Sequence, residues 1–355
     1  MGMWEVLPLD LLARVFSFLP PDSVARAMAA CKHWLACARS RAAAPRHAPW
    51  LIALPARGGP ACFAHDPALN RWHALPLDFL PCPLRLVAPV GRSLLCRLTA
   101  SSDLRLVLLN PFTRQFRHLP DLATPRRNPA VGVIYSSPFS VIVAGGASGS
   151  GYEPKVELYE DGRVDRWESL GPMPVEFAVR LTVWTPNESV HAGDGAMYWM
   201  TSARAYSVMG FDLRRRTWRE VKAPMADQLE WAALVRRPNR KLGLVGGAVG
   251  GQGTVWELTD KDAWAAVAEV PAKLGQRIWG CRKEAAGAAL GGAVRCVGDE
   301  RTVYLFKDFG SEMLVWEEER GWRLMEGRRR VSSTPIKAAL LHPTLSVAEI
   351  FHASM

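Results

Sequence analysis

The feature that most constrains the fold of this chain is a sequence pattern that recurs six times between residues 51 and 330. Each copy reads as a strand end, a polar turn and an aromatic residue, as in "AHDPALNRWHALPL" (64–77) and "GFDLRRRTWREVKAPM" (210–225). The aromatic residues of the copies are separated by 44, 51, 51, 46 and 58 residues and are Trp72, Phe116, Trp167, Trp218, Trp264 and Trp322. Such a period predicts repeated structural units, each packed against the next.

The segments between these turns predict β-structure. Runs of 5 to 8 residues such as "FSVIVAGG", "KVELYED" and "TVYLF" are rich in β-branched and aromatic residues, and few helical candidates separate them. A single four-stranded sheet cannot bury both of its faces, so the units are expected to stack around an axis. We therefore predict a six-bladed β-propeller, with each repeat aromatic packed in the core of its blade rather than displayed as a ligand platform.

Two segments fall outside the six repeats. The segment "IKAALLHPTLSVAEIF" (336–351) is expected to supply a strand that closes the ring against the first blade, which makes 331–355 a candidate closing segment. The first fifty residues instead carry apolar residues at helical spacing and predict three short helices near 9–18, 22–30 and 31–42. Prolines in "RAAAPRHAP" (41–49) stop helix propagation. We expect a helical domain over 1–46 and the propeller over 47–355.

Composition places the chain among ordinary globular proteins and limits its surroundings. Hydrophobic residues make up 49 % of the 355 residues and charged residues 22 %. No apolar run approaches the roughly 20 residues needed to cross a bilayer, and Glu5 and Asp10 interrupt the N-terminal apolar stretch. The seven cysteines are scattered and never spaced as CxxC, which is typical of reduced thiols. These features favour the cytoplasm, the nucleus or both, with no membrane association.

The basic residues are spread over the chain as small clusters. The net charge is +10, and arginines gather at 126–127, 214–216, 236–237 and 328–330. A nucleic-acid-binding protein is expected to collect such charge on one face, interleaved with stacking aromatics. Here each cluster falls in a turn-like stretch between apolar runs, so we interpret the clusters as solvated loops and expect no nucleic-acid partner. If they share a face of the ring, they would favour an acidic protein target.

No catalytic signature emerges from the sequence. It contains no HExxH pair, no GxSxG elbow and no local motif that would activate a cysteine. The glycine-rich stretch "GLVGGAVGGQG" (243–253) precedes the strand-like "TVWELTD" rather than the helix that a phosphate-binding loop requires. We therefore expect no catalytic residue, cofactor or metal ligand, although residues distant in sequence can still meet in a fold.

The repeats resemble kelch units, which have a period of about 50 residues. The kelch hallmark is a double glycine that ends one strand, followed by a Tyr and a Trp. "VIVAGG" with Tyr159 and Trp167 matches this hallmark well, and "LGLVGG" with Trp264 matches it in part, whereas the other four repeats lack the double glycine. "LNPFTRQFRHLP" also resembles the Asn-Pro-x-Thr repeat of plant F-box proteins. The resemblance implies a kelch-like propeller with several degenerate blades.

The N-terminal segment "LPLDLLARVFSFLPPDSVARAMAACKHWLACARS" (7–40) resembles the F-box, a three-helix motif that binds a Skp-family adaptor. Phe16 and Ala30 are mild departures from the family pattern. The pattern is matched at Leu7-Pro8, Leu11, Leu12, Val15, Leu19-Pro20, Val24, Arg26, Cys31-Lys32, Trp34 and Ser40. The candidate adaptor-binding residues are Leu7, Pro8, Leu11, Leu12, Val15, Leu19, Pro20 and Trp34.

An F-box followed by kelch repeats is a common arrangement in plant ubiquitin-ligase receptors. The resemblance implies a non-catalytic substrate receptor that binds a Skp-family adaptor, and through it a cullin, while the propeller holds a target protein for ubiquitination and proteasomal degradation. Two alternatives stay open at this point. One is a scaffold or transcriptional cofactor that uses the same adaptor without degrading its partner, and the other is an enzyme that uses the propeller channel.

Overall fold

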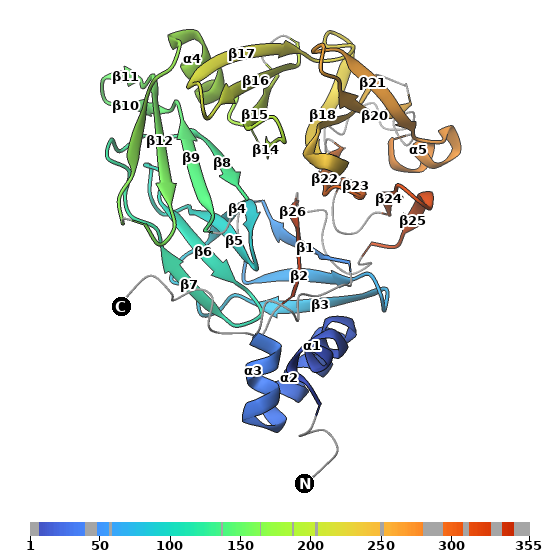
Figure 1. Ribbon diagram of the computed structural model, residues 1–355. Helices are drawn as coiled ribbons and strands as arrows, with labels where there is room; N and C mark the ends of the chain where they lie inside the picture. The colour runs from blue at the N-terminus through green and yellow to red at the C-terminus, as the bar shows by residue number, and fades with distance from the viewer. Residues whose placement is uncertain are drawn as a thin grey trace.

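Three short N-terminal helices precede a ring of six four-stranded sheets in the described chain (Figure 1). The computed structural model describes residues 7–39, 48–56, 59–135, 138–163, 165–186, 188–202, 205–248, 252–279, 294–307, 312–327 and 336–343. The prediction of a mainly β protein with N-terminal helices and a six-bladed propeller is confirmed.

The N-terminal helices are α1 (Leu9–Phe18), α2 (Pro21–Ala30) and α3 (Lys32–Arg39). Prolines precede α1 and open α2, where the missing backbone N–H would have no helical partner in any case. Leu12 and Phe16 recur four residues apart and enter a small core of their own with Cys37 of α3. The Phe16 ring meets Trp34 edge-on, with centroids 5.7 Å apart. The helices therefore have a hydrophobic core separate from that of the propeller.

Each blade is a four-stranded antiparallel sheet. From the innermost strand outward, blade 1 is β26 (Ile336–Leu341), β1 (Trp50–Pro55), β2 (Ala61–Asp66) and β3 (Arg71–Pro76); blade 2 is β4 (Leu84–Val90), β5 (Ser93–Leu98), β6 (Leu106–Asn110) and β7 (Gln115–His118). Blade 3 is β8 (Ala130–Ile134), β9 (Ser140–Ala144), β12 (Lys155–Glu160) and β13 (Glu168–Pro172); blade 4 is β14 (Ser189–His191), β15 (Ala196–Thr201), β16 (Ser207–Asp212) and β17 (Thr217–Lys222). Blade 5 is β18 (Leu229–Arg236), β19 (Leu242–Ala248), β20 (Gly253–Leu258) and β21 (Trp264–Glu269); blade 6 is β22 (Arg295–Gly298), β23 (Thr302–Phe306), β24 (Met313–Glu317) and β25 (Gly321–Met325).

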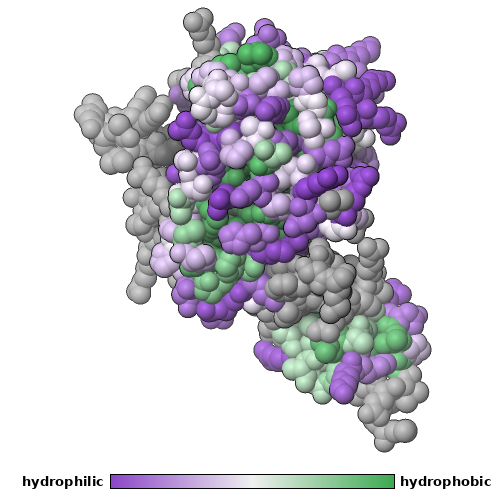
Figure 2. Space-filling view, turned by 90° about the vertical axis from the view of Figure 1, so that its left-hand side faces the viewer, coloured by the Kyte–Doolittle hydropathy of each residue, from purple (hydrophilic) through white to green (hydrophobic). Residues whose placement is uncertain are grey.

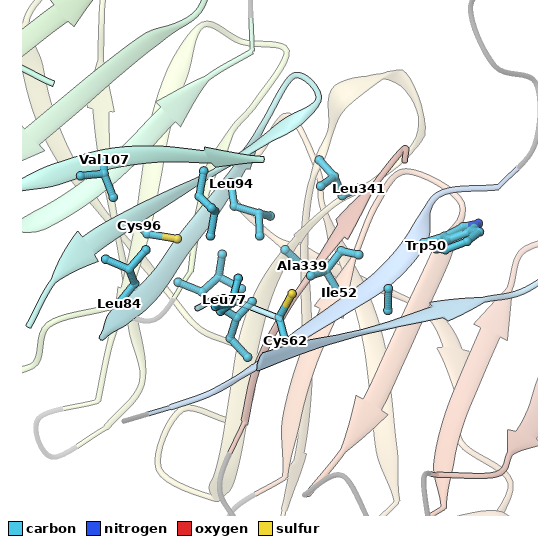
Figure 3. Close-up of a cluster of buried hydrophobic side chains, with 14 residues drawn as sticks. Trp50, Ile52, Cys62, Leu77, Leu84, Leu94, Cys96, Val107, Ala339 and Leu341 are labelled. Atoms are coloured by element: carbon cyan, nitrogen blue, oxygen red, sulfur yellow. The ribbon is translucent and has the colours of Figure 1, made fainter. Parts of the chain in front are cut away.

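Blade 1 combines strands from opposite ends of the chain. β26 pairs with β1 from Trp50 opposite Leu341 to Pro55 opposite Ile336. Figure 3 shows Ala339 and Leu341 of β26 beside Ile52 in the core that joins blades 1 and 2. The C-terminal strand thus completes the first sheet and supplies part of its packing against the second.

The hydrophobic core of the ring is divided into six clusters, one between each pair of neighbouring blades. The cluster between blades 1 and 2, drawn in Figure 3, contains Cys62, Leu94 and Val107. The cluster between blades 6 and 1 contains Leu51, Tyr304 and Ile336, so the ring is packed all the way round. Every sheet therefore buries both faces, which a lone blade cannot do.

The turn between the third and fourth strands of each blade follows one design. In every blade a residue with positive φ lies in this turn or at the start of the fourth strand, where it helps the chain reverse direction. These residues are Asn70, Arg114, Gly162, Arg216, Asp262 and Gly321. In three blades a side-chain oxygen of Asp66, Asn110 or Asp212 accepts two backbone N–H groups of the turn. This local chemistry is the polar turn that recurs in the sequence.

Because neighbouring strands alternate in direction, all these turns lie on one face of the ring. The turns between the first and second strands lie on the same face, which we call the turn face. The opposite face, which we call the link face, carries the connections from blade to blade. Helices α4 (Val175–Val183) and α5 (Ala272–Trp279) lie in two of these connections, and a small hairpin of β10 (Ala147–Ser148) and β11 (Gly151–Tyr152) lies beside α4. The sequence predicted neither helix.

Candidate functional site

The first candidate site is an exposed apolar stripe on α1. Leu11, Val15 and Phe18 have 48 %, 46 % and 61 % of their surface exposed. They recur at intervals of four and three residues, which places them along one side of the helix. Leu9 is exposed as well, but two residues before Leu11 it faces the other side of the helix. Figure 2 shows hydrophobic side chains gathered on this bundle below the ring.

The residues predicted to bind an adaptor differ in exposure. Pro8, Leu11, Val15 and Pro20 are exposed, and Leu7, Leu19 and Trp34 are half-buried. Leu12 does not reach the surface, because it is only 1 % exposed and packs within the core of the helices. We therefore remove Leu12 from the candidate surface.

Phe18 belongs to the same stripe as Leu11 and Val15, and the sequence reasoning missed it. The signal that could have found Phe18 is its spacing from Leu11 and Val15, which continues one helical stripe. This exposed face of α1 lies outside the small core of the three helices. It can bury apolar area against a partner, at roughly 25 cal/mol for each Å² removed from water.

The six repeat aromatics occupy equivalent positions, at the contact between each blade and the preceding one. Trp167 is buried between blades 2 and 3, and the other five are half-buried against the corresponding clusters. Three indoles donate hydrogen bonds across the contact: Trp72 to the carbonyl of Glu326 (3.4 Å), Trp167 to Pro120 (2.8 Å) and Trp264 to Lys222 (2.9 Å). These residues join blades and do not line a ligand site.

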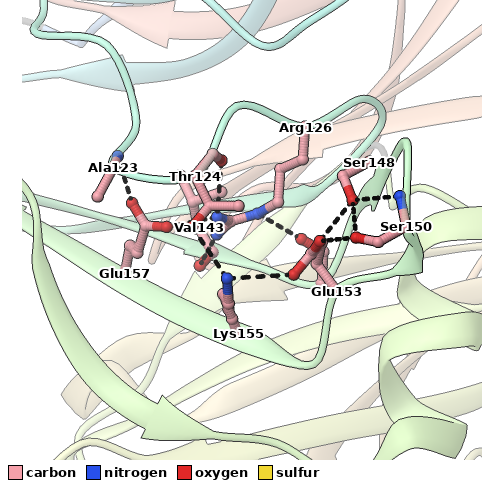
Figure 4. Close-up of polar contacts among 10 residues, drawn as sticks. Ala123, Thr124, Arg126, Val143, Ser148, Ser150, Glu153, Lys155 and Glu157 are labelled. Carbon is pink, nitrogen blue, oxygen red and sulfur yellow. Dashed lines mark hydrogen bonds and ion pairs between the residues drawn. The ribbon is translucent and has the colours of Figure 1, made fainter.

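The interpretation of the arginine clusters as solvated loops is wrong for Arg126. Its side chain is fully buried on the link-face side of blade 3 and is ion-paired with Glu157 (Figure 4). Arg126 Nε also donates to the carbonyl of Gly145 at 2.7 Å, and Glu157 accepts the backbone N–H of Ala123 at 3.1 Å. The Arg126–Glu157 pair has a structural role, because the charge of Arg126 is neutralised inside the blade and is not available to a partner.

Arg237 is likewise buried, with 1 % of its side chain exposed and its guanidinium 4.5 Å from the centroid of the Trp316 ring. Only the 214–216 cluster, in the turn between β16 and β17, matches the solvated interpretation in full. That turn lies on the turn face, whereas 126–127 belongs to a link-face connection. The clusters therefore do not form one basic face, and 328–330 lies outside the described residues.

The described ranges contain neither a metal site nor a helix that could span a membrane. Within them, no group of three or more His, Cys, Asp or Glu side chains could hold a metal ion. Among the described helices, none is long and apolar enough to cross a membrane. The described cysteines Cys62, Cys96 and Cys296 are buried, and burial raises the pKa of each thiol. These thiols are protonated core residues.

Comparison with known proteins agrees with this arrangement. Residues 4–43 match the F-box-like family model. The F-box/kelch-repeat protein At3g61590 of Arabidopsis thaliana is 30 % identical over 125 residues, which cover 33 % of this chain and 30 % of that protein. Protein UNUSUAL FLORAL ORGANS of the same plant is 26 % identical over 272 residues, covering 67 % of this chain and 59 % of that protein. The F-box/kelch-repeat protein At5g43190 of the same plant is 23 % identical over 289 residues, covering 76 % of this chain and 70 % of that protein.

The matches thus span less than two thirds of the length of the first two relatives. A helical segment that matches the F-box-like model, joined to a six-bladed ring with kelch features, defines the class. The chain is an F-box protein with a kelch-like propeller, and proteins of this family are typically non-catalytic adaptors.

Proposed function

We propose that this protein is the substrate receptor of a Skp/cullin/F-box ubiquitin ligase. The α1 surface binds a Skp-family adaptor, and the propeller holds a target protein close to the ubiquitin-charged partner enzyme. The receptor makes and breaks no bonds. It contributes local concentration and orientation of the target, as in any catalysis by proximity.

The observation that carries the proposal is the exposed stripe of Leu11, Val15 and Phe18 within the segment that matches the F-box-like model. The three-helix core is complete without these side chains, because it is formed by residues such as Leu12 and Phe16. An exposed apolar stripe is a typical docking surface for a partner.

The test is co-purification of the full chain with a Skp-family adaptor, comparing the wild type with the double variant Leu11→Asp/Val15→Asp. Two buried carboxylates at the contact should weaken adaptor binding by about 100-fold, since loss of each central apolar contact costs about 1–2 kcal/mol. Both positions are exposed in the free chain, so its melting temperature should stay unchanged. Leu12 is unsuitable for this purpose, because a charge there would unfold the bundle.

Leu69→Asp is the matched control, because Leu69 is 67 % exposed in a propeller turn far from the helices in sequence. This variant should bind the adaptor as the wild type does. Wild-type adaptor binding by the α1 double variant would contradict the docking surface.

The fate of the target decides between a degradative receptor and a non-degradative scaffold. The full-length Leu11→Asp/Val15→Asp variant should still hold targets on its propeller, so proteins bound to it can be identified by mass spectrometry. For a degradative receptor, these targets accumulate when the proteasome is inhibited. Targets whose abundance is insensitive to inhibition would favour the scaffold.

A further inference from the structure

The innermost strands of the blades surround a central channel. It contains a cavity of about 290 Å³, near the lower end of the range for small-molecule sites. Each of the six innermost strands, or the residue next to it, contributes to the lining. Val87, Val190, Val297 and Ala338 make much of the wall apolar. The space is therefore suited to a small ligand that has both an apolar and a charged part.

Charged side chains meet at the link-face end of this channel. Glu188 directly precedes β14, Arg295 is the first residue of β22 and Lys337 is the second residue of β26. β22 and β26 are neighbours in the ring, and β14 belongs to blade 4 on the other side of the channel. All three strands begin at the link face, and all three side chains line the cavity. Each is half-buried, so it lies within the ring but keeps part of its surface open to the channel.

Two further arginines add positive charge at the same end. Arg85 of β4 and Arg97 of β5 stand directly opposite each other in blade 2. Burial lowers the pKa of Lys337, and these two arginines are close enough to lower it further. Like charges placed opposite on neighbouring strands destabilise a sheet. The end of the channel thus holds four basic groups and one acid.

Arg97, Arg295 and Lys337 are half-buried and Arg85 is exposed, and all four differ from the buried arginines of the ring in forming no ion pair with another described residue. Arg126 is paired with Glu157, and Arg237 lies 3.6 Å from Glu318. In the described part of the chain, no ion pair or side-chain hydrogen bond is formed by the five residues Arg85, Arg97, Glu188, Arg295 and Lys337. Desolvated positive charge without a contacting anion is costly, and a bound anion would offset that cost.

We propose that the channel binds a small oxyanion, a carboxylate- or phosphate-bearing molecule, with Lys337 and Arg295 as its direct donors. Arg85 and Arg97 strengthen the positive field behind them, and the apolar wall accommodates the rest of the ligand. This site is separate from the adaptor surface on α1. It would give the protein a small-molecule ligand besides the adaptor and the target protein of the proposed function.

Glu188 makes the affinity for the anion depend on pH. Burial raises the pKa of Glu188 to about 7, although Lys337 and Arg295 lower it. Above this pKa the carboxylate carries a negative charge that repels an anion, and below it the group is neutral. Anion binding should therefore tighten as the pH falls from 8 to 6. The other groups that face Glu188 are Cys296, which is protonated throughout, and the two bases, while His191 lies two residues beyond Ser189 on the same strand.

The first measurement is calorimetric titration of the full chain with citrate, inorganic phosphate and sulfate at constant ionic strength. We expect at least one of citrate and phosphate to bind with a dissociation constant of about 1 mM or lower. Tighter binding of citrate would identify a carboxylate ligand, and tighter binding of phosphate would identify a phosphate ligand. Sulfate keeps its charge between pH 6 and 8, so it is the probe for the pH comparison.

Two variants with opposite expected effects separate binding from folding. Lys337→Met should weaken binding at least about tenfold, since one donor and one charge are lost. Glu188→Gln should tighten binding at pH 8 by about tenfold and remove most of the difference in sulfate affinity between pH 6 and pH 8. A misfolded variant cannot bind more tightly. Arg214→Met, in an exposed turn outside the channel, is the charge-matched control and should leave affinity unchanged.

Failure of citrate, phosphate and sulfate to bind at 10 mM or so would overturn the proposal. Equal weakening by Lys337→Met and Arg214→Met would overturn it as well, because binding would then follow net charge alone. If an acidic peptide bound through Lys337 while none of the small anions did, the channel would be part of the target-binding surface instead. Adaptor binding is unaffected by any of these results, so the receptor role is tested separately.

Discussion

At the scale of single residues, two arginines are buried where the sequence indicated exposed charge. Arg126 and Arg237 occur in arginine pairs that the sequence cannot distinguish from solvated turns. The partners that neutralise Arg126 are distant in sequence: Glu157 lies 31 residues away, and the carbonyl of Gly145 lies 19 residues away. Local composition contains no trace of such contacts, so the burial of these arginines could not be predicted from one sequence.

The double glycine of the kelch hallmark, Gly145-Gly146, lies beside the buried Arg126, and this contact explains the second glycine. Gly146 has a φ of +109°, and a Cβ there would lie 2.9 Å from Cδ of Arg126. A glycine is therefore needed both for the backbone conformation and for the space that the buried guanidinium stem occupies. The sequence predicted the glycine pair as a feature of the repeat, but its purpose becomes visible only with Arg126 in place.

Replacement of Arg126 by Met should lower the unfolding free energy of the propeller by about 3 kcal/mol, because Glu157 is left buried and unpaired. The change is measured as a shift of the urea midpoint. Arg127→Met is the matched control, because Arg127 is the adjacent residue and its side chain is exposed. Its effect should stay within about 0.5 kcal/mol. Equal midpoints for the two variants would show that the buried pair contributes nothing.

At the scale of elements, the repeat was predictable because its signal is local. The side-chain oxygen, the positive-φ residue and the aromatic of each turn fall within a few residues, as Asp212, Arg216 and Trp218 do. Helix α4 was missed for the opposite reason. It has only nine residues, and its buried side chains, Phe177, Ala178 and Leu181, gain their apolar surroundings from blades 3 and 4. So short a helix is determined by the tertiary structure that it covers.

The positive φ of Arg216 (+56°) gives an element-scale prediction. An L-residue in this conformation is strained by about 1–2 kcal/mol, which glycine avoids. The only ion pair of Arg216 among the described residues, 4.0 Å from Glu168, is exposed and contributes little. Arg216→Gly should therefore raise the melting temperature by about 1–3 °C, after the entropic cost of glycine is subtracted.

Arg214→Gly provides the comparison for this prediction. Arg214 lies in the same turn and is equally exposed, but its φ is not positive, so glycine there relieves no strain. We expect the Arg214 variant to melt at or slightly below the wild-type temperature. If both glycine variants shift the melting temperature alike, strain at position 216 is not the cause.

At the scale of the whole molecule, a closed ring follows from repeated sheets that must bury both faces. The number of aromatic repeats in the sequence equals the number of blades, because each blade has one aromatic that packs on its predecessor. The helical bundle has its own core and exposes Leu11 and Val15 on the outer side of α1. The channel charges could not be predicted, since Glu188, Arg295 and Lys337 meet only when blades 4, 6 and 1 surround the axis.

Closure of the ring depends on β26, and this gives a prediction for the entire propeller. Removal of residues 331–355 leaves β1 paired only with β2 and exposes the cores on both sides of blade 1, to which Ile336, Ala339 and Leu341 contribute. At about 2–4 kcal/mol for the loss of each large buried side chain, the truncated chain should melt at a much lower temperature or fail to fold cooperatively. A second truncation that removes only 344–355 retains β26. The difference between the two melting temperatures measures the contribution of this strand, and identical melting would refute a closing role.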